Sequence, residues 1–151
     1  MMRLSKKILF AIEAVLDIAY NSGGQPVQSR DITRRQGIPR RYLEHALQKL
    51  VRRKILIGVR GPRGGYHLAL ERRRITIGGI VRAVHDQNPD ENQQAETCES
   101  ELGRKVVHPV WDELQDTFME QLDDVTIDDL CSRADKAGID SEGRNNMDFT
   151  I

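Results

Sequence analysis

The 151-residue sequence is poor in cysteine, has no long apolar run and contains no recognisable set of catalytic residues. Its two cysteines, Cys98 and Cys131, are too few for a disulfide framework, so we expect them to be reduced or engaged in redox or metal chemistry. No apolar run approaches the roughly 18 residues of a membrane span, and the start of the chain lacks a signal-type apolar block, which predicts a cytoplasmic protein with no membrane partner. No Ser-His-Asp triad, carboxylate pair or H-x-x-E motif can be placed at one site, so we do not expect an enzyme.

The formal net charge of zero conceals two oppositely charged halves. Residues 1–85 contain 18 Lys and Arg against 5 Asp and Glu, whereas residues 86–151 contain 5 against 18. A basic half of this kind is an electrostatic footprint for a polyanion, and the acidic half is then expected to stay clear of it. A solvated charged surface is the alternative, because Lys and Arg are common on exposed helix faces.

Apolar periodicities in the basic half predict a helix-turn-helix. A core helix is expected at about 5–21, where apolar residues recur at helical spacing. A short helix through Arg35 follows, with Ser29 as its N-cap and Gly37 as the left-handed residue that ends it. The next helix is expected at 39–53, and its initial proline suits the first turn, where a missing N–H costs nothing.

The predicted helix 39–53 has an apolar face and a polar face. The apolar stripe consists of Leu43, Ala46, Leu47, Leu50 and Val51. The outward face carries Arg40, Arg41, Glu44, His45, Gln48 and Arg52. Arg can bond guanine, Glu can accept from cytosine and Gln suits adenine, whereas Arg or Tyr on phosphates would fix the register. A solvated helix face would have a similar composition, so both interpretations stay open at this point.

Two β-rich segments, 55–59 and 66–70, flank the turn of the stretch RGPRGGYHL. The glycine spacing fits neither a Walker loop nor a dinucleotide-binding loop. The segments therefore predict a hairpin beside the second helix, which makes the fold mainly α with a small β-hairpin, a winged helix-turn-helix. Pro62 and glycines such as Gly64 would form a tight turn that approaches DNA closely, while Arg60 and Arg63 project into the minor groove. An ordinary hairpin with a soluble turn is the alternative.

A long amphipathic helix is predicted at about 103–122, after a short apolar helix near 80–84. Its stripe consists of Val107, Val110, Trp111, Leu114, Phe118 and Leu122. This stripe is wide enough to pack on its own domain and also to meet a twin helix, so we expect a homodimer. Packing within one chain is the alternative. Thr126 then resembles the start of a capping box that opens one more helical turn.

Several segments also resemble the IscR/NsrR-type family of bacterial winged-helix transcription regulators. They are R-L-S-K at 3–6, S-R-D-I at 29–32, R-Q-G-I at 35–38, Y-L-E at 42–44 and, above all, V-R-G-P-R-G-G-Y at 59–66. The resemblance extends to about Leu130. It implies a homodimer on a promoter palindrome and, in many members, an iron–sulfur cluster such as a 2Fe-2S cluster that senses iron, redox state or nitric oxide. The genes controlled would then be those of iron–sulfur, iron or redox-stress responses.

The polar face, the wing and the resemblance together give a set of residues expected to bind double-stranded DNA. They are Arg3, Ser29, Pro39, Arg40, Arg41, Tyr42, Glu44, Gln48, Arg60, Pro62, Arg63 and Gly64. By the resemblance, Glu44 would read a base and Arg60 would be the minor-groove arginine of the wing. Pro39 and Arg41 stand where the family often has small hydroxyl residues, which leaves the operator sequence open. A winged-helix module that binds protein or RNA through the same basic face is the alternative function.

The segment 86–102 has almost no apolar residue and cannot be packed core, so we interpret it as a sensing loop. In cluster-bearing relatives this loop holds three cysteines and a histidine follows it, whereas here only Cys98 and His108 occupy such positions. A cluster commonly needs four protein ligands. Cys98 and His108 could bind a cluster with carboxylates such as Glu96, Glu99 or Glu101, or with groups of the partner chain. Alternatively, Cys98 is a redox-sensing thiol, or the site is degenerate and no cofactor binds.

The sequence thus divides into four parts. Residues 1–85 are the predicted winged helix-turn-helix DNA-binding domain, 86–102 the sensing or cluster loop, 103–131 the dimerisation helix and a short terminal helix, and 132–151 an acidic tail. The tail is rich in Asp, Asn and Gly, and we expect it to be mobile. Cys131 is expected to be a packed free thiol.

Overall fold

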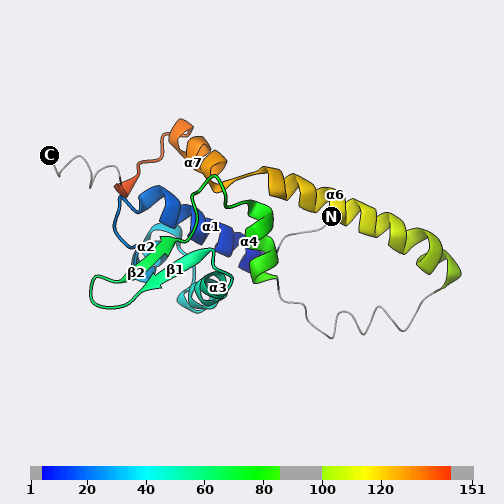
Figure 1. The fold of residues 1–151 in the computed structure, drawn as a ribbon, viewed down its shortest axis with the longest axis horizontal. Helices are drawn as coiled ribbons and strands as arrows, with labels where there is room; N and C mark the ends of the chain where they lie inside the picture. The colour runs from blue at the N-terminus through cyan, green and yellow to red at the C-terminus, as the bar shows by residue number, and fades with distance from the viewer. Residues whose placement is uncertain (1–4, 86–99, 144–151) are drawn as a thin grey trace.

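The structure is a computed structural model and describes residues 5–85 and 100–143. Predictions made for Arg3, for Cys98 and for the segments 86–99 and 144–151 therefore lie outside the described residues. Figure 1 shows a body of helices and a hairpin from which one long helix extends. The elements in order are α1 (Lys6–Asn21), α2 (Ser29–Gln36), α3 (Arg40–Arg52), β1 (Leu56–Val59), β2 (Gly65–Leu68), α4 (Ile77–Val84), a π-helical segment η1 (Gly103–Val107), α6 (His108–Asp124) and α7 (Ile127–Lys136).

Helix α1 runs through the centre of the body and supplies much of its core. It begins after Ser5, whose hydroxyl oxygen accepts a hydrogen bond from the Ile8 N–H at 3.4 Å. Its inward face consists of fully buried residues, namely Ala11, Ala14, Val15 and Ile18. Helices α2, α3, α4 and α7 all pack against α1. The core helix predicted at 5–21 is therefore confirmed.

Helices α2 and α3 form the predicted pair joined by a tight turn. Gly37 ends α2 with φ of 66°, in the left-handed region, and its N–H donates to the Thr33 carbonyl at 2.9 Å. The predicted helix starts are wrong by one residue. Gln28 occupies the capping position and α2 begins at Ser29 itself, while Pro39 stands just before α3 in an extended conformation.

Strands β1 and β2 pair as an antiparallel hairpin, with Leu56 opposite Leu68 at its base. Each strand has four residues, one fewer than its predicted segment. Val27 adds an isolated bridge to Tyr66, with two backbone hydrogen bonds of 3.0 and 2.9 Å. This bridge keeps the chain extended in front of α2, which explains why the helix begins only at Ser29 and not earlier.

Residues from α4 and α7 complete the same core, including Ile80 and Ile127. Helix α7 starts with the predicted capping box, in which the Thr126 hydroxyl accepts from the Asp129 N–H at 3.1 Å and the Asp129 carboxylate accepts from the Thr126 N–H at 2.9 Å. These hydrogen bonds lower the pKa of Asp129. Cys131 is buried and free, and its burial raises the pKa of the thiol.

The acidic tail differs from its prediction over residues 132–143. Helix α7 continues to Lys136, and the segment after it returns to the end of α1. Ser141 is only 7% exposed, and its hydroxyl donates to the Tyr20 carbonyl. The polar residues of this segment are ordered because they find polar partners on distant helices, and such partners leave no periodic pattern in the sequence.

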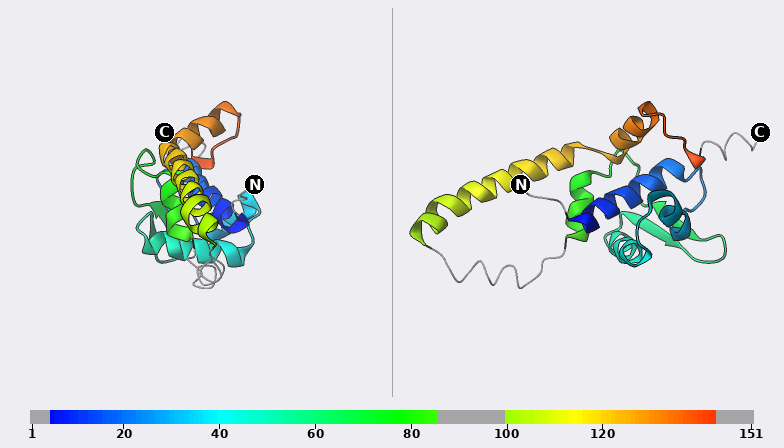
Figure 2. Two further views of the ribbon diagram at one scale, coloured as in Figure 1. Left: turned by 90° about the vertical axis from the view of Figure 1, so that its right-hand side faces the viewer. Right: turned by 180° about the vertical axis from the view of Figure 1, so that it is seen from behind.

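The long helix predicted at 103–122 is found as η1 followed directly by α6. Arg82 on α4 holds the end of α6 through two hydrogen bonds to Asp123, of 2.6 and 2.7 Å, which lower the pKa of that carboxyl. The other end of α6 extends away from the body (Figures 1 and 2). Within the described ranges, no helix is both long and apolar enough to span a membrane.

Candidate nucleic-acid interface

The outward face of α3 carries the polar side chains that were predicted to contact DNA. Arg40, Arg41, Tyr42, Glu44 and Gln48 are all exposed, while the apolar stripe of the helix faces the core. Arg40 Nε donates to a Glu44 carboxylate oxygen at 2.9 Å, one helical turn away. This pair pre-positions the Glu44 carboxylate on the outer surface of the helix.

Tyr42 is held against α1 by its aromatic ring. The ring centroid lies 6.1 Å from that of Phe10, and Lys7 Nζ lies 5.9 Å from the Tyr42 centroid. Because the ring is packed on α1, the hydroxyl is the polar end that Tyr42 can offer to a phosphate. Arg3, which precedes α1, is outside the described residues.

The turn of the wing, which we define as β1, β2 and the residues between them, requires glycine. The Gly64 N–H donates to the Gly61 carbonyl at 2.9 Å, and Gly61 has φ of 107°. A Cβ atom at Gly64 would lie 2.2 Å from the Val59 carbonyl oxygen, so a side chain there would force the turn open. The turn leaves Arg60 and Arg63 exposed at the tip.

The wing is also tied to the start of α2. Gln28, in the capping position of α2, donates its side-chain N–H to the Pro62 carbonyl at 3.2 Å. At the start of β2, Gly65 lies so close to the Val27 carbonyl that a Cβ atom would be 2.5 Å from that oxygen. The wing tip and the helix-turn-helix are therefore held in a fixed relation before any ligand binds.

An open cleft lies between the wing and the helix-turn-helix and brings together several predicted residues. Those that line it are Ser29, Arg40, Arg60, Pro62 and Gly64. The others with described positions, Pro39, Arg41, Tyr42, Glu44, Gln48 and Arg63, do not line the cleft. Cationic side chains of α2, α3 and the wing thus meet at one cleft, a suitable arrangement for a polyanion.

Among the residues that line this cleft outside the predicted set are three at the start of α2 and within it: Gln28, Arg30 and Thr33. Arg30 and Thr33 share a side of α2 with Ser29, so helical spacing from Ser29 could have identified them. The role of Gln28 depends on a partner 34 residues away in the wing. No local sequence signal indicates such a contact.

The part of α6 that extends from the body carries an exposed apolar face. Its large side chains in α6 are Val110, Trp111 and Leu114, and the row continues before α6 through Leu102 and through Val106 and Val107 of η1; all six are between 48% and 74% exposed. Phe118 and Leu122, further along the predicted stripe, are half-buried near the end where α6 packs on α4. A row of large apolar side chains on one exposed helix face is unusual for a monomeric surface.

His108, the candidate metal ligand among the described residues, is exposed at the start of α6. The backbone N–H of His108 donates to the Gly103 carbonyl, which closes the π-helical turn, and the imidazole lies near Gly103. Glu101, a proposed oxygen donor, pairs instead with Lys105 at 3.0 Å. No group of three or more His, Cys, Asp or Glu that could hold a metal ion occurs within residues 5–85 and 100–143. Of the two residues predicted as cluster ligands, His108 is described and Cys98 lies outside the described residues.

Comparison with known proteins gives consistent matches over most of the chain. The sequence model of the Rrf2 family, described as an iron-dependent transcriptional regulator, matches residues 4–133. The HTH-type transcriptional regulator IscR of Pectobacterium carotovorum is 34% identical over an alignment of 153 positions, which covers 98% of this chain and 89% of that protein. The IscR of Pectobacterium atrosepticum is 37% identical over 131 residues, which cover 85% and 79%.

Two solved structures have the same architecture. The structure of T. potens IscR superposes with a TM-score of 0.73 at 30% identity and covers 90% of each chain. That of CymR (YrzC), named as the global cysteine regulator of B. subtilis, superposes with a TM-score of 0.70 at 28% identity and covers 88% of this chain and 98% of the other. Together with the observed hairpin, these structures confirm the predicted winged-helix fold.

Proposed function

This chain belongs to the Rrf2 family of transcriptional regulators, and from that premise we propose that it binds promoter DNA as a homodimer and regulates transcription. The relatives it matches are named as transcriptional regulators and not as enzymes. The main observation in support of the proposal is that Arg40 on α3 and Arg60 on the wing line the same cationic cleft. Chromosomal DNA as the target implies action in the bacterial cytoplasm.

In the proposed complex, α3 enters the major groove with its exposed face toward the bases. Arg41 and Gln48 can donate to purine edges, and Glu44 can accept from a cytosine amino group. The wing lies beside the same segment of duplex, where Arg60 reaches the negative potential of the minor groove. The hydrogen bond from Gln28 to the wing tip reduces the ordering required when DNA binds.

The homodimer is supported by the exposed apolar face of α6. Trp111 and Leu114 are 48% and 58% exposed, and a second copy of α6 is the simplest surface that would cover both. An isologous pair of α6 helices would place the two winged helices on opposite sides of a two-fold axis. The DNA target would then be a palindrome with half-sites about one helical turn, or a multiple of it, apart.

We further propose that the regulated genes belong to iron–sulfur, iron or redox-stress responses. The support is the description of the family as iron-dependent and the closeness of His108 to Cys98 in the sequence. If an iron–sulfur cluster binds, it supplies redox-sensitive chemistry, and His108 and Cys98 are the ligands this chain would contribute. His108 is exposed at the start of α6, next to the proposed dimer interface. A ligand bound at His108 could therefore also influence dimerisation.

The cofactor proposal has a direct test in protein purified without oxygen. Wild-type protein is expected to contain iron and sulfide and to show a visible chromophore. His108→Ala should lose the chromophore, whereas His67→Ala on β2 should retain it. A wild type that is colourless and free of iron under these conditions would exclude the cluster and leave a thiol sensor or a regulator without a cofactor.

The DNA-binding proposal is tested by selecting duplexes from a random pool and measuring affinity for the recovered sequence. A scrambled duplex of equal length and composition is the control. We expect recovery of a palindrome that binds at least about a thousandfold more tightly than the scrambled duplex at the same salt concentration. Equal affinity for the two duplexes would contradict sequence-specific regulation and favour the protein- or RNA-docking alternative.

A further inference from the structure

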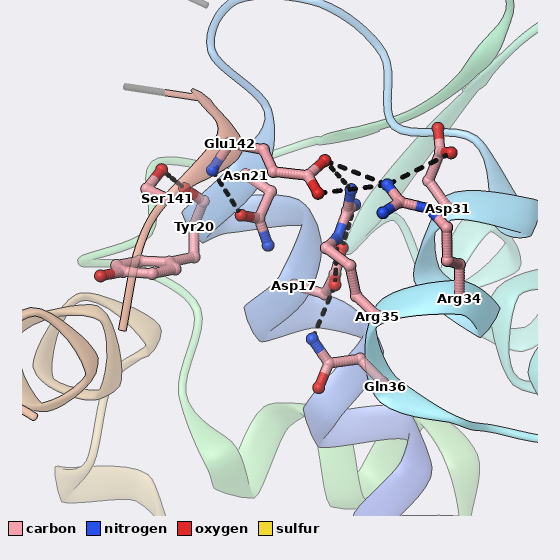
Figure 3. Close-up of polar contacts among 9 residues, drawn as sticks. All are labelled: Asp17, Tyr20, Asn21, Asp31, Arg34, Arg35, Gln36, Ser141 and Glu142. Atoms are coloured by element: carbon pink, nitrogen blue, oxygen red, sulfur yellow. Dashed lines mark hydrogen bonds and ion pairs between the residues drawn. The ribbon is translucent and has the colours of Figure 1, made fainter. Parts of the chain in front are cut away.

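The last described residues form a clasp on the helix-turn-helix (Figure 3). We define this clasp as residues 139–143. Ser141 donates its hydroxyl hydrogen to the Tyr20 carbonyl, and the Glu142 N–H donates to the Asn21 side-chain oxygen at 3.0 Å. These bonds fix the clasp on the end of α1. They also direct the Glu142 side chain toward α2.

The Glu142 carboxylate lies between two consecutive arginines of α2. Arg34 Nη2 is 3.1 and 3.3 Å from its two oxygens, and Arg35 Nη1 makes a short hydrogen bond to one of them. Burial acts to raise the pKa of Glu142, but the hydrogen bond from Arg34 and the two positive charges outweigh it and hold the pKa below its usual value. The carboxylate is therefore ionised at neutral pH and neutralises positive charge on α2.

Arg35 does not depend on Glu142 for a partner. Its Nε and Nη2 donate to the two oxygens of Asp17 at 2.9 and 2.7 Å, and the Asp17 side chain is fully buried. Gln36 adds a third hydrogen bond to Asp17, at 2.8 Å. Departure of the Glu142 carboxylate would leave this buried pair intact.

Arg34 is in a different position. Its side chain is 60% exposed, and among the described residues its second ion-pair partner, besides Glu142, is Asp31 of the same helix at 3.8 Å. It follows Arg30, which lines the cleft beneath the wing, by four residues, so the two share a side of α2. Arg34 therefore lies beside the cationic cleft, and its guanidinium is directed to the Glu142 carboxylate.

A guanidinium binds phosphate oxygens with the same planar fork that it uses for carboxylate oxygens. We propose that Arg34 is a further position for binding a DNA backbone phosphate, and that Glu142 occupies this position in place of the phosphate. The exposed Arg34–Glu142 pair contributes little to stability, so the site can open while the fold persists. The inference rests on the proposed DNA-binding function and adds that the C-terminal segment lowers DNA affinity.

The test is the salt dependence of binding to a random duplex and to the selected palindrome, measured by fluorescence anisotropy. For Glu142→Gln, the slope of log affinity against log salt should become steeper by about 0.9 for each Arg34 that gains a phosphate. One such contact corresponds to an affinity gain of up to about eightfold at about 0.1 M salt. Asp140→Asn is the matched control, because it removes an exposed carboxylate of the clasp for which no ion pair occurs among the described residues. It should leave the slope at the wild-type value.

Arg34→Gln completes the experiment. By itself it should leave the slope unchanged, and in combination with Glu142→Gln it should return the slope to the wild-type value. The inference is overturned if Glu142→Gln binds like Asp140→Asn, if its gain persists without Arg34, or if Arg34→Gln alone already flattens the slope. Thermal unfolding verifies that each variant is folded, and Glu142→Ala serves as a second variant. A wild type that shows no preference for the palindrome would refute the proposed function, whereas normal wild-type binding with equal slopes would refute the inference alone.

Discussion

The buried pair of Asp17 and Arg35 allows a quantitative prediction for stability. The Asp17 side chain is fully buried and Arg35 is only 14% exposed, so replacing Arg35 by glutamine leaves a carboxylate inside the protein with Gln36 as its remaining side-chain partner. Breaking a buried ion pair in this way costs about 3 to 5 kcal/mol. The Asp17 hydrogen bond also raises the pKa of Arg35, so the guanidinium is charged at any accessible pH.

The same substitution at the neighbouring position provides the control. Arg34 is 60% exposed, and its ion pairs contribute about 0 to 1 kcal/mol. At roughly 2 to 4 °C per kcal/mol for a chain of this size, Arg35→Gln should lower Tm by about 6 to 20 °C and Arg34→Gln by less than about 4 °C. Circular dichroism melts at one fixed protein concentration measure both, because the stability of a dimer depends on concentration.

Asp17→Asn extends the measurement to a double-mutant cycle. Each single variant should be strongly destabilised, and the double variant should be less destabilised than the sum of the two, because it leaves neither charge unpaired. Equal melting temperatures for Arg35→Gln and Arg34→Gln would refute the reasoning that the buried pair holds α2 on α1.

Four further outcomes follow from the wing, α6 and α7. Replacing Arg60 and Arg63 by glutamine should make the slope of log DNA affinity against log salt concentration shallower by about 0.9 for each lost phosphate contact. A slope equal to that of the wild type would show that the wing does not contact the duplex. Gly64→Ala should weaken DNA binding, because its Cβ atom would lie 2.2 Å from a backbone oxygen across the turn and would force the turn open. Anisotropy showing full affinity would contradict this. Trp111→Glu should convert dimers to monomers in sedimentation experiments, because it places a charge in the apolar face of α6, and a dimer of wild-type strength would exclude that face as the interface. The hydrogen bonds that lower the pKa of Asp129 add stability above the unfolded pKa of about 3.9, and this stability is lost as pH falls through the lower folded value. When stability is measured as pH is lowered through this range, Asp129→Asn should therefore lose less stability than the wild type. Identical stability losses in the two proteins would show that ionised Asp129 does not stabilise the capping box.

Local signals in the sequence were sufficient for most of the fold. The periodic apolar residues of α1 and α3, the left-handed Gly37 and the capping box at Thr126 each depend on residues within one or two helical turns. The glycines of the wing turn were predictive for the same reason. Starts of the two helices of the helix-turn-helix were less well predicted and differ by one residue, since α2 begins at Ser29 and α3 at Arg40.

The contacts that sequence reasoning missed are long-range and polar. Glu142 is separated from Arg34 by 108 residues, and Ser141 from Tyr20 by 121. Composition alone made the segment from 132 onward look like a mobile tail, since it has few apolar residues. Partners at such separations become visible only when the packing of α7 against α1 brings the two regions together.

The central claim is that two subunits place α3 and the wing in adjacent grooves of one duplex, and hydroxyl-radical footprinting on the selected palindrome tests it most directly. The account predicts two equivalent protected patches whose centres are about 34 to 36 Å apart along the duplex, or a multiple of that distance, each extending from a major groove into the neighbouring minor groove. A single patch from one subunit, or weak protection spread evenly over the duplex, would contradict it.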